Sequence, residues 1–188
     1  MEPKKEDTVY NQLFRELEQY RTEERKLEHL ENLLKKNPDQ ETRKTAFVIM
    51  AALQSYKMWY NSAAKSYHNA ADLAKTFSEK IDLLLKAITL FVTARDYKTA
   101  EEVTRQAVVL ASSKDKDSIR SHLINTYLKQ ADQYEANKMF NKTIKVLSRL
   151  LNLKIDNEQK KSVLERLVYL YEKIGNPIEA NKIRQQMR

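Results

Sequence analysis

Apolar side chains recur along this chain at the spacing of a helix. Leu84, Ala87 and Phe91 are separated by three and four residues, so they share one helix face. Comparable stripes begin at four other places, where the first large residues are Tyr10, Phe47, Tyr127 and Leu164. Two stripes contain a polar residue, at Gln54 and Gln130. Short polar segments follow each stripe, and the pattern predicts an all-α protein whose helices are joined by short turns.

The stripes belong to an internal repeat. Its reference positions are separated by 37, 37, 43 and 37 residues, and they are Lys26, Ala63, Ala100, Thr143 and Ala180. The longer interval contains the polar segment 112–118, which predicts a loop. Each unit is expected to be a helix, a short turn and a second helix. The predicted hairpins cover residues 8–37, 40–76, 79–112, 118–152 and 158–188.

Stacking of these hairpins follows from their apolar faces. A single hairpin cannot bury both of its faces, so neighbouring hairpins must share a continuous core. We therefore predict one domain over residues 1–188, an α–α superhelix in the form of a right-handed solenoid of about five hairpins. The alternative is a plain helical bundle or a coiled coil. Residues 8–36 have no strong helix breaker, so they are compatible with one long helix as well as with a hairpin.

Two segments carry a recognisable motif. Tyr97-x-x-Ala100, with Ala107 behind it and Phe91 in front, resembles a tetratricopeptide repeat (TPR). Gly175-Asn176-Pro177-x-x-Ala180 resembles a second copy. The resemblance covers nearly the whole chain, although the period here exceeds the family's roughly 34 residues. It implies a TPR-like fold and says little about function.

A second resemblance is weaker and concerns the segment around Tyr67. Ala63-Ala64, Tyr67 and Ala70-Ala71 are similar to residues of the SNAP-type vesicle-fusion adaptors. This resemblance implies a vesicle-fusion adaptor as an alternative function. The chain lacks an apolar membrane loop near its start and an acidic C-terminal tail, both of which that alternative would need.

Composition excludes several kinds of chemistry. The 188 residues include one glycine and no cysteine, which leaves no phosphate-binding glycine loop, thiol nucleophile or cysteine zinc site. His29, His68 and His122 have no second histidine at ligand spacing, and His68 with Asp72 forms at most an ion pair on one helix face. We therefore expect no enzyme activity, no cofactor and no metal. No stretch reaches the about 20 apolar residues of a transmembrane helix, and we expect a cytoplasmic protein.

A partner groove is expected on the first helices of the hairpins, which line the concave side of such a stack. The candidate residues fall between the packing positions, and they are Val48, Ala52, Leu85, Thr89, Val92, Leu128, Asp132 and Tyr169. An apolar centre with charged ends suits a peptide or an amphipathic helix of another protein. The alternative is that these residues only complete the core or are covered by a terminus of the chain itself. Trp59 and Tyr60 are expected to wedge between hairpins, with a role as an anchor as the alternative.

The net charge of +8 falls mostly on the second half of the chain. Lys138, Lys142, Lys145 and Arg149 follow helical spacing and form a basic stripe. Such a stripe can bind nucleic acid or an anionic surface, although a solvated lysine-rich face is the favoured explanation. No aromatic residue alternates with it to stack on bases.

These patterns together predict a non-enzymatic scaffold or adaptor that binds another protein in the groove. Nucleic-acid or anionic-surface binding through residues 138–161 is the first alternative. A homo-oligomer is also possible, because an exposed groove or stack end can pair with itself.

Overall fold

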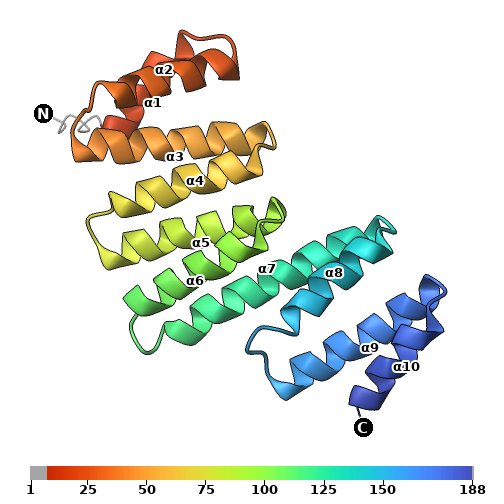
Figure 1. Cartoon of the computed structure of the whole chain (residues 1–188). Helices are drawn as coiled ribbons and strands as arrows, with labels where there is room; N and C mark the ends of the chain where they lie inside the picture. Colours follow the sequence, from red (N-terminus) through yellow and green to blue (C-terminus); the bar gives the residue numbers. More distant parts are fainter. Residues whose placement is uncertain (1–7, 188) are drawn as a thin grey trace, which may run out of the picture. The chain divides into compact units, whose positions relative to one another are not determined.

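The computed structural model describes residues 8–187. These residues form ten helices and no strand, which confirms the all-α class (Figure 1). The helices are α1 (Val9–Glu18), α2 (Glu23–Lys35), α3 (Gln40–Tyr56), α4 (Tyr60–Asp72), α5 (Phe77–Thr93), α6 (Tyr97–Leu110), α7 (Lys116–Ala136), α8 (Phe140–Leu150), α9 (Asn157–Lys173) and α10 (Pro177–Gln186).

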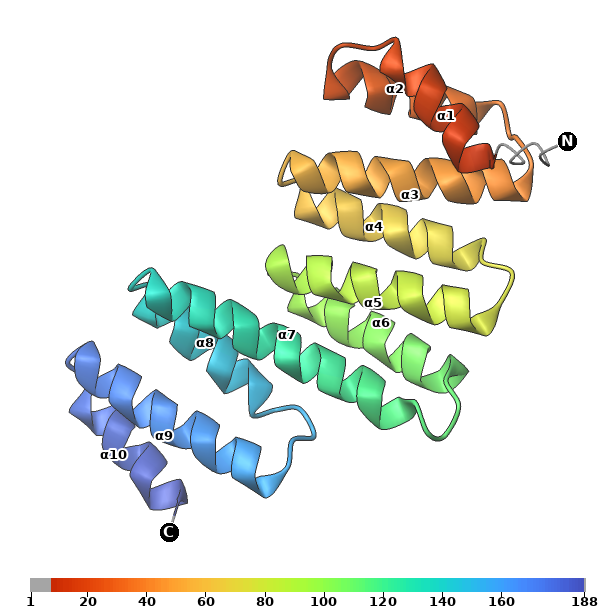
Figure 2. The same ribbon diagram turned by 180° about the vertical axis from the view of Figure 1, so that it is seen from behind.

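The chain divides into two compact units, whereas the sequence predicts one domain over residues 1–188. Unit 1 ends at Ile119 and unit 2 begins at Arg120, so the boundary falls inside α7. Within unit 1, α3 to α6 lie side by side and alternate in direction (Figure 2). Within unit 2, α9 packs against both α8 and α10.

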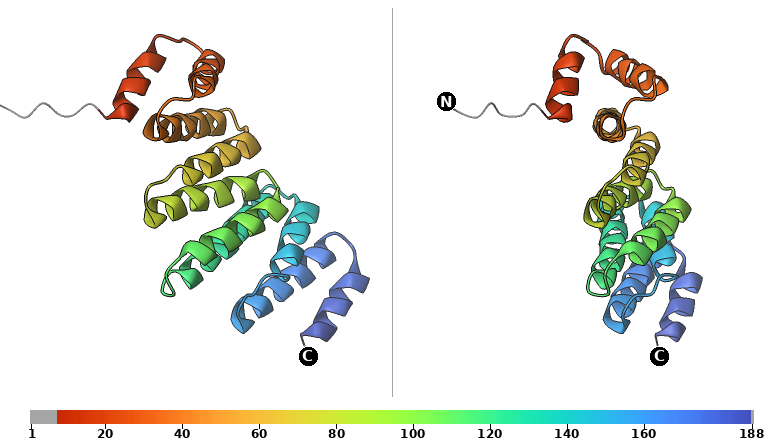
Figure 3. Two further views of the ribbon diagram at one scale, coloured as in Figure 1. Left: turned by 60° about the vertical axis from the view of Figure 1, so that its left-hand side comes forward. Right: turned by 90° about the vertical axis from the view of Figure 1, so that its left-hand side faces the viewer.

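Residues 8–36 form two helices and not one. Thr22 ends the intervening turn, and its hydroxyl accepts a hydrogen bond from the backbone N–H of Arg25 at 3.4 Å. Such a cap satisfies one of the free N–H groups at a helix start. Both helices pack on α3, which is seen nearly end-on in the right-hand view of Figure 3 while α1 and α2 run across it. Their shared cluster consists of Leu13, Leu17, Leu27, Leu30, Ala46, Ile49 and Met50.

An ion-pair network holds the first turn of α5 against α3. The Nζ atom of Lys44 lies 2.5 Å from Glu79 and 2.9 Å from Glu41. Hydrogen bonding to Lys44 holds the pKa of both carboxyl groups below their usual range. Glu79 also accepts the backbone N–H of Lys75 at 3.1 Å, which ties the α4–α5 loop to the same network. The start of α5 is therefore a fixed part of unit 1.

Four hairpin turns share one backbone motif. In each, a residue with positive φ follows the helix, and these residues are Met58, Arg95, Lys138 and Gly175. The next N–H bonds to the carbonyl five residues earlier, at 2.8 or 2.9 Å, in the pairs Trp59–Gln54, Asp96–Phe91, Met139–Tyr134 and Asn176–Tyr171. This is the Schellman helix end. Its positions are separated by 37, 43 and 37 residues, so the turns follow the spacing of the sequence repeat.

The left-handed turn position predicts opposite effects of two substitutions. Gly175 has a φ of +73°, and a Cβ there would meet nothing within 4 Å, so Gly175→Ala changes only the backbone preference. We expect it to lower the free energy of unfolding by about 1 kcal/mol. Lys138→Gly relieves the same strain at φ 56° and should raise that free energy by about 0.5–1 kcal/mol. Denaturant unfolding followed by circular dichroism measures both, and changes of equal sign would contradict the argument.

Candidate functional site

An apolar pocket of about 600 Å³ opens beside the start of α5 in unit 1. Phe77, Ile81 and Leu85 follow one another at four-residue spacing, so one face of α5 forms one wall. The other lining residues come from α5, from the end of α6 and from the segment that follows it, and they are Ser78, Asp82, Leu110, Ala111, Ser112, Asp115, Ser118 and Ile119. Phe77 is one of the lining residues, and its side chain is 69% exposed.

Local hydrogen bonds shape both walls of this pocket. The Thr76 hydroxyl accepts the N–H of Glu79 at 3.2 Å, which makes Phe77 the first residue of α5. On the other side, Ser112 Oγ donates to Asp115 Oδ2 at 2.6 Å and closes the loop before α7. The charged side chains among the lining residues are Asp82 and Asp115, both carboxylates in a chain of net charge +8. The pocket therefore favours an apolar group with a cation beside it.

A second apolar surface of unit 1 carries exposed aromatic rings. The rings of Tyr10 and Phe14 stack with centroids 6.2 Å apart, and both side chains are about half exposed. Burial raises the pKa of Tyr67, and the nearby Tyr10 phenol raises it further. The sequence placed Tyr10 in the packing stripe. The structure leaves about half of its side chain exposed.

The predicted groove residues differ in accessibility and lie in both units. Val48, Leu85, Thr89 and Leu128 are half-buried, whereas Ala52, Asp132 and Tyr169 are exposed. Val92 is fully buried, so it belongs to the core of unit 1 and offers no surface to a partner. Thr89, three residues earlier, donates a hydrogen bond from its hydroxyl to the Leu85 carbonyl at 3.0 Å. Leu85 is the predicted groove residue that lines the apolar pocket.

Asp132 has a structural partner within unit 2. The guanidinium of Arg166 lies 2.7 Å from Asp132 and 2.6 Å from Glu135, and it joins α9 to α7. Burial alone would lower the pKa of Arg166, but hydrogen bonds to the two carboxylates outweigh it and raise that pKa. Asp132 is therefore an ion-pair residue between two helices. Tyr169, also assigned to the groove, has the Lys173 ammonium 5.3 Å from its ring centre.

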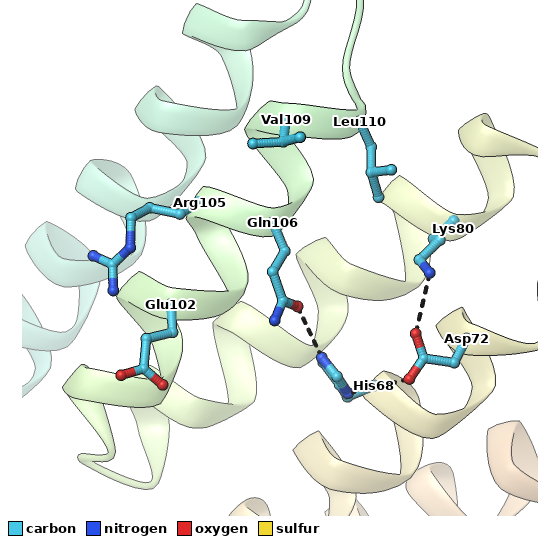
Figure 4. A pocket seen from close by; sticks show the side chains of 8 residues that line it. All are labelled: His68, Asp72, Lys80, Glu102, Arg105, Gln106, Val109 and Leu110. Atoms are coloured by element: carbon cyan, nitrogen blue, oxygen red, sulfur yellow. Dashed lines mark hydrogen bonds and ion pairs between the residues drawn. The ribbon is translucent and has the colours of Figure 1, made fainter.

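A cleft of about 750 Å³, lined by charged and apolar side chains, lies between α4, the start of α5 and α6 (Figure 4). His68 Nε2 lies 3.0 Å from Gln106 Oε1, and His68 Nδ1 lies 3.9 Å from Asp72, as the sequence spacing allowed. The Lys80 ammonium lies 3.1 Å from Asp72, so a cation balances the charge of this carboxylate. Val109 and Leu110 form an apolar side of this cleft (Figure 4). Glu102 and Arg105 lie apart from the hydrogen-bonded side chains of His68 and Gln106 (Figure 4). These contacts link successive helices, and none presents a nucleophile beside a base.

The basic stripe is shorter on the helix than the sequence suggested. Helix α8 begins at Phe140, and Lys138 lies before it in the left-handed turn position. The stripe on the helix therefore consists of Lys142, Lys145 and Arg149. The ammonium of Lys142 contacts Met139 Sδ at 3.4 Å and lies 5.7 Å from the Tyr134 ring centre. Sequence reasoning missed this aromatic neighbour because it lies on α7. Binding of an anion by the stripe stays a prediction.

The described residues contain neither a metal-binding cluster nor a membrane-spanning helix. Between residues 8 and 187, no group of three or more histidine, aspartate and glutamate side chains is arranged to hold a metal ion. No helix in the same range is both long enough and apolar enough to cross a membrane. Neither a protein-family model nor a curated protein sequence matches this chain. The apolar pocket beside α5 is the candidate site that we take further, because it joins an exposed aromatic side chain, Phe77, to two carboxylates, Asp82 and Asp115.

Proposed function

We propose that this chain is a non-enzymatic scaffold that binds a segment of another protein. In this proposal the helices form a right-handed solenoid of about five TPR-like hairpins. The segment places an apolar side chain in the pocket of Phe77, Ile81 and Leu85, with a lysine or arginine next to Asp82 or Asp115. The observation that supports it most is the accessible apolar face of α5, where Phe77 remains 69% exposed.

Apolar burial supplies the binding energy in this proposal. Burying one side chain the size of leucine or phenylalanine contributes about 1.5–3 kcal/mol. Such a contact is weak alone, so register and specificity depend on the two carboxylates at the rim. An amphipathic helix or an extended peptide can present both groups within a few residues.

Replacing Phe77 by aspartate tests the pocket without disturbing the core, because this side chain is mostly exposed. We expect capture of the partner protein by the tagged chain to fall at least tenfold, since a charge replaces an apolar contact. Quantitative mass spectrometry of pull-downs from the source lysate, treated with nuclease, measures the loss. Ile178→Asp is the matched control, because Ile178 is also 69% exposed and lies on α10 of unit 2.

The two variants separate the possible outcomes. A partner lost with Phe77→Asp and retained with Ile178→Asp supports the pocket. Equal capture by wild type and Phe77→Asp would remove the pocket from the proposal. Partner proteins that are no longer recovered after nuclease treatment would favour the alternative, in which the basic stripe binds nucleic acid.

A further inference from the structure

Helix α8 carries cations without carboxylates. Between residues 8 and 187 it is the one helix that contains neither aspartate nor glutamate. The longer run of residues 136–155 contains no acidic residue either, and its basic residues are Lys138, Lys142, Lys145, Arg149 and Lys154. Two of these lysines, Lys138 and Lys145, are exposed, and Lys142 is half-buried. Along this helix the basic stripe therefore has charges of one sign.

The acidic residues that flank this run in the sequence have other partners. Glu135 lies 2.6 Å from the guanidinium of Arg166 on α9. Asp156 caps α9, where its side chain accepts the backbone N–H of Gln159 at 2.7 Å. In the described part of the chain, no carboxylate forms an ion pair with the lysines of the basic stripe. Their charge is therefore not balanced by the protein itself.

Neighbouring helices of unit 2 pair their surface charges. Lys161 and Glu165 lie 4.0 Å apart on α9, and Lys182 and Glu179 lie 2.6 Å apart on α10. Alternating charge of this kind is typical of a helix face that contacts only water. The basic stripe lacks this alternation, although α7, α9 and α10 all contain carboxylates. An anion from outside the chain would balance the stripe.

An aromatic ring and a thioether lie next to the first lysine of α8. The ammonium of Lys142 lies 3.4 Å from Met139 Sδ and 5.7 Å from the centre of the Tyr134 ring. Met139 is 41% exposed, and Tyr134 is half-buried. The sequence of the stripe offered no aromatic residue for contact with a base, and the structure supplies this one from α7. A cation beside an aromatic ring suits a phosphate and the neighbouring base of a single strand.

We propose that the basic stripe binds single-stranded nucleic acid, with Lys142, Lys145 and Arg149 on neighbouring phosphates and a base beside Tyr134. Residues three and four positions apart in an α-helix are separated by about 4.5 and 6 Å along its axis, so these cations form a row that an extended strand can follow. Contacts of this kind position a strand without reading its sequence. RNA and single-stranded DNA offer the same phosphates and bases.

Two other anionic partners fit this surface less well. A helix that binds a membrane surface inserts its apolar side, but the apolar side of α8 is already buried. Protein interfaces are depleted in lysine and have an apolar centre, whereas the stripe consists of cations. The stripe lies within unit 2 and the apolar pocket within unit 1, so neither proposal depends on the other.

The salt dependence of binding tests the proposal. The probes are fluorescein-labelled oligo(U) and oligo(dT), and anisotropy gives their affinity between roughly 50 and 200 mM salt. Each phosphate contact contributes about 0.7 to the slope of log affinity against log salt, so three contacts predict a slope near about −2. The variant K142Q/K145Q should reduce this slope by about 1.4 and weaken binding on the order of tenfold at low salt. Tighter binding of oligo(U) than of oligo(dT) would add a contact to the 2′-hydroxyl group.

The matched control is K65Q/K114Q, which removes two positive charges from exposed lysines of unit 1. It should bind both strands with the slope of the wild type. Equal losses in the two variants would overturn the proposal, because affinity would then follow net charge alone. It would also be overturned if neither strand bound at about 50 mM salt. Binding of phosphatidylserine vesicles without binding of either strand would assign the stripe to a membrane surface instead.

Discussion

Replacing Phe91 by alanine lowers the free energy of unfolding by about 3–5 kcal/mol, because it removes a buried aromatic ring and leaves a cavity. Phe91 is 2% exposed and lies on the α5 face that also buries Leu84 and Ala87. Its ring therefore belongs to the apolar stripe that the sequence repeats most clearly. Its backbone carbonyl accepts the Asp96 N–H of the Schellman turn, and that bond survives the substitution.

Denaturant-induced unfolding followed by far-UV circular dichroism measures this loss. Val109→Ala is the matched control, because Val109 is 80% exposed and its truncation should change stability by less than about 0.5 kcal/mol. A loss below about 1 kcal/mol for Phe91→Ala would mean that the α5 stripe is not part of a close-packed core.

The periodic part of the fold could be predicted from the sequence. Helical stripes and the 37- and 43-residue intervals depend on local spacing, and the turns at Arg95 and Gly175 recur at the positions that the spacing indicates. Three details depended on non-local facts. Tyr10 is about half exposed, Val92 is fully buried, and Lys138 lies in the left-handed turn position before α8. Periodicity within one helix gives no information on such neighbours.

The candidate site was predicted in part. Leu85 was selected by its place between packing positions, and it lines the pocket. Asp115 and Ser118 come from segment 112–118, which the sequence predicted to be only a loop that absorbs extra residues. Its last three residues instead begin α7, and no pattern indicated that the segment would complete a wall. The exposure of Tyr56 and Met58 could not be predicted from the sequence either, because an apolar residue at a turn can belong to the core or to the surface.

One polar misfit of the sequence pattern has a structural explanation that predicts a measurable coupling. Gln54 interrupts the apolar stripe of α3, yet it is only 8% exposed. Its Oε1 atom accepts a hydrogen bond from the Ser66 hydroxyl of α4 at 2.7 Å. The two side chains satisfy each other between neighbouring helices, which makes a polar residue acceptable at a packing position.

Ser66→Ala removes the donor and leaves the Gln54 oxygen buried, so we expect stability to fall by about 1–3 kcal/mol. The double variant Q54L/S66A replaces both partners by apolar groups, so it should be near wild type in stability. Gln54→Leu alone should cost less than Ser66→Ala, because a serine in a helix can turn its hydroxyl to a backbone carbonyl. A double-mutant cycle from denaturant unfolding gives the coupling energy, expected between about 0.5 and 3 kcal/mol. Additive single effects would show that the α3–α4 contact does not depend on this hydrogen bond, and that Gln54 is held at its packing position by the aliphatic part of its side chain.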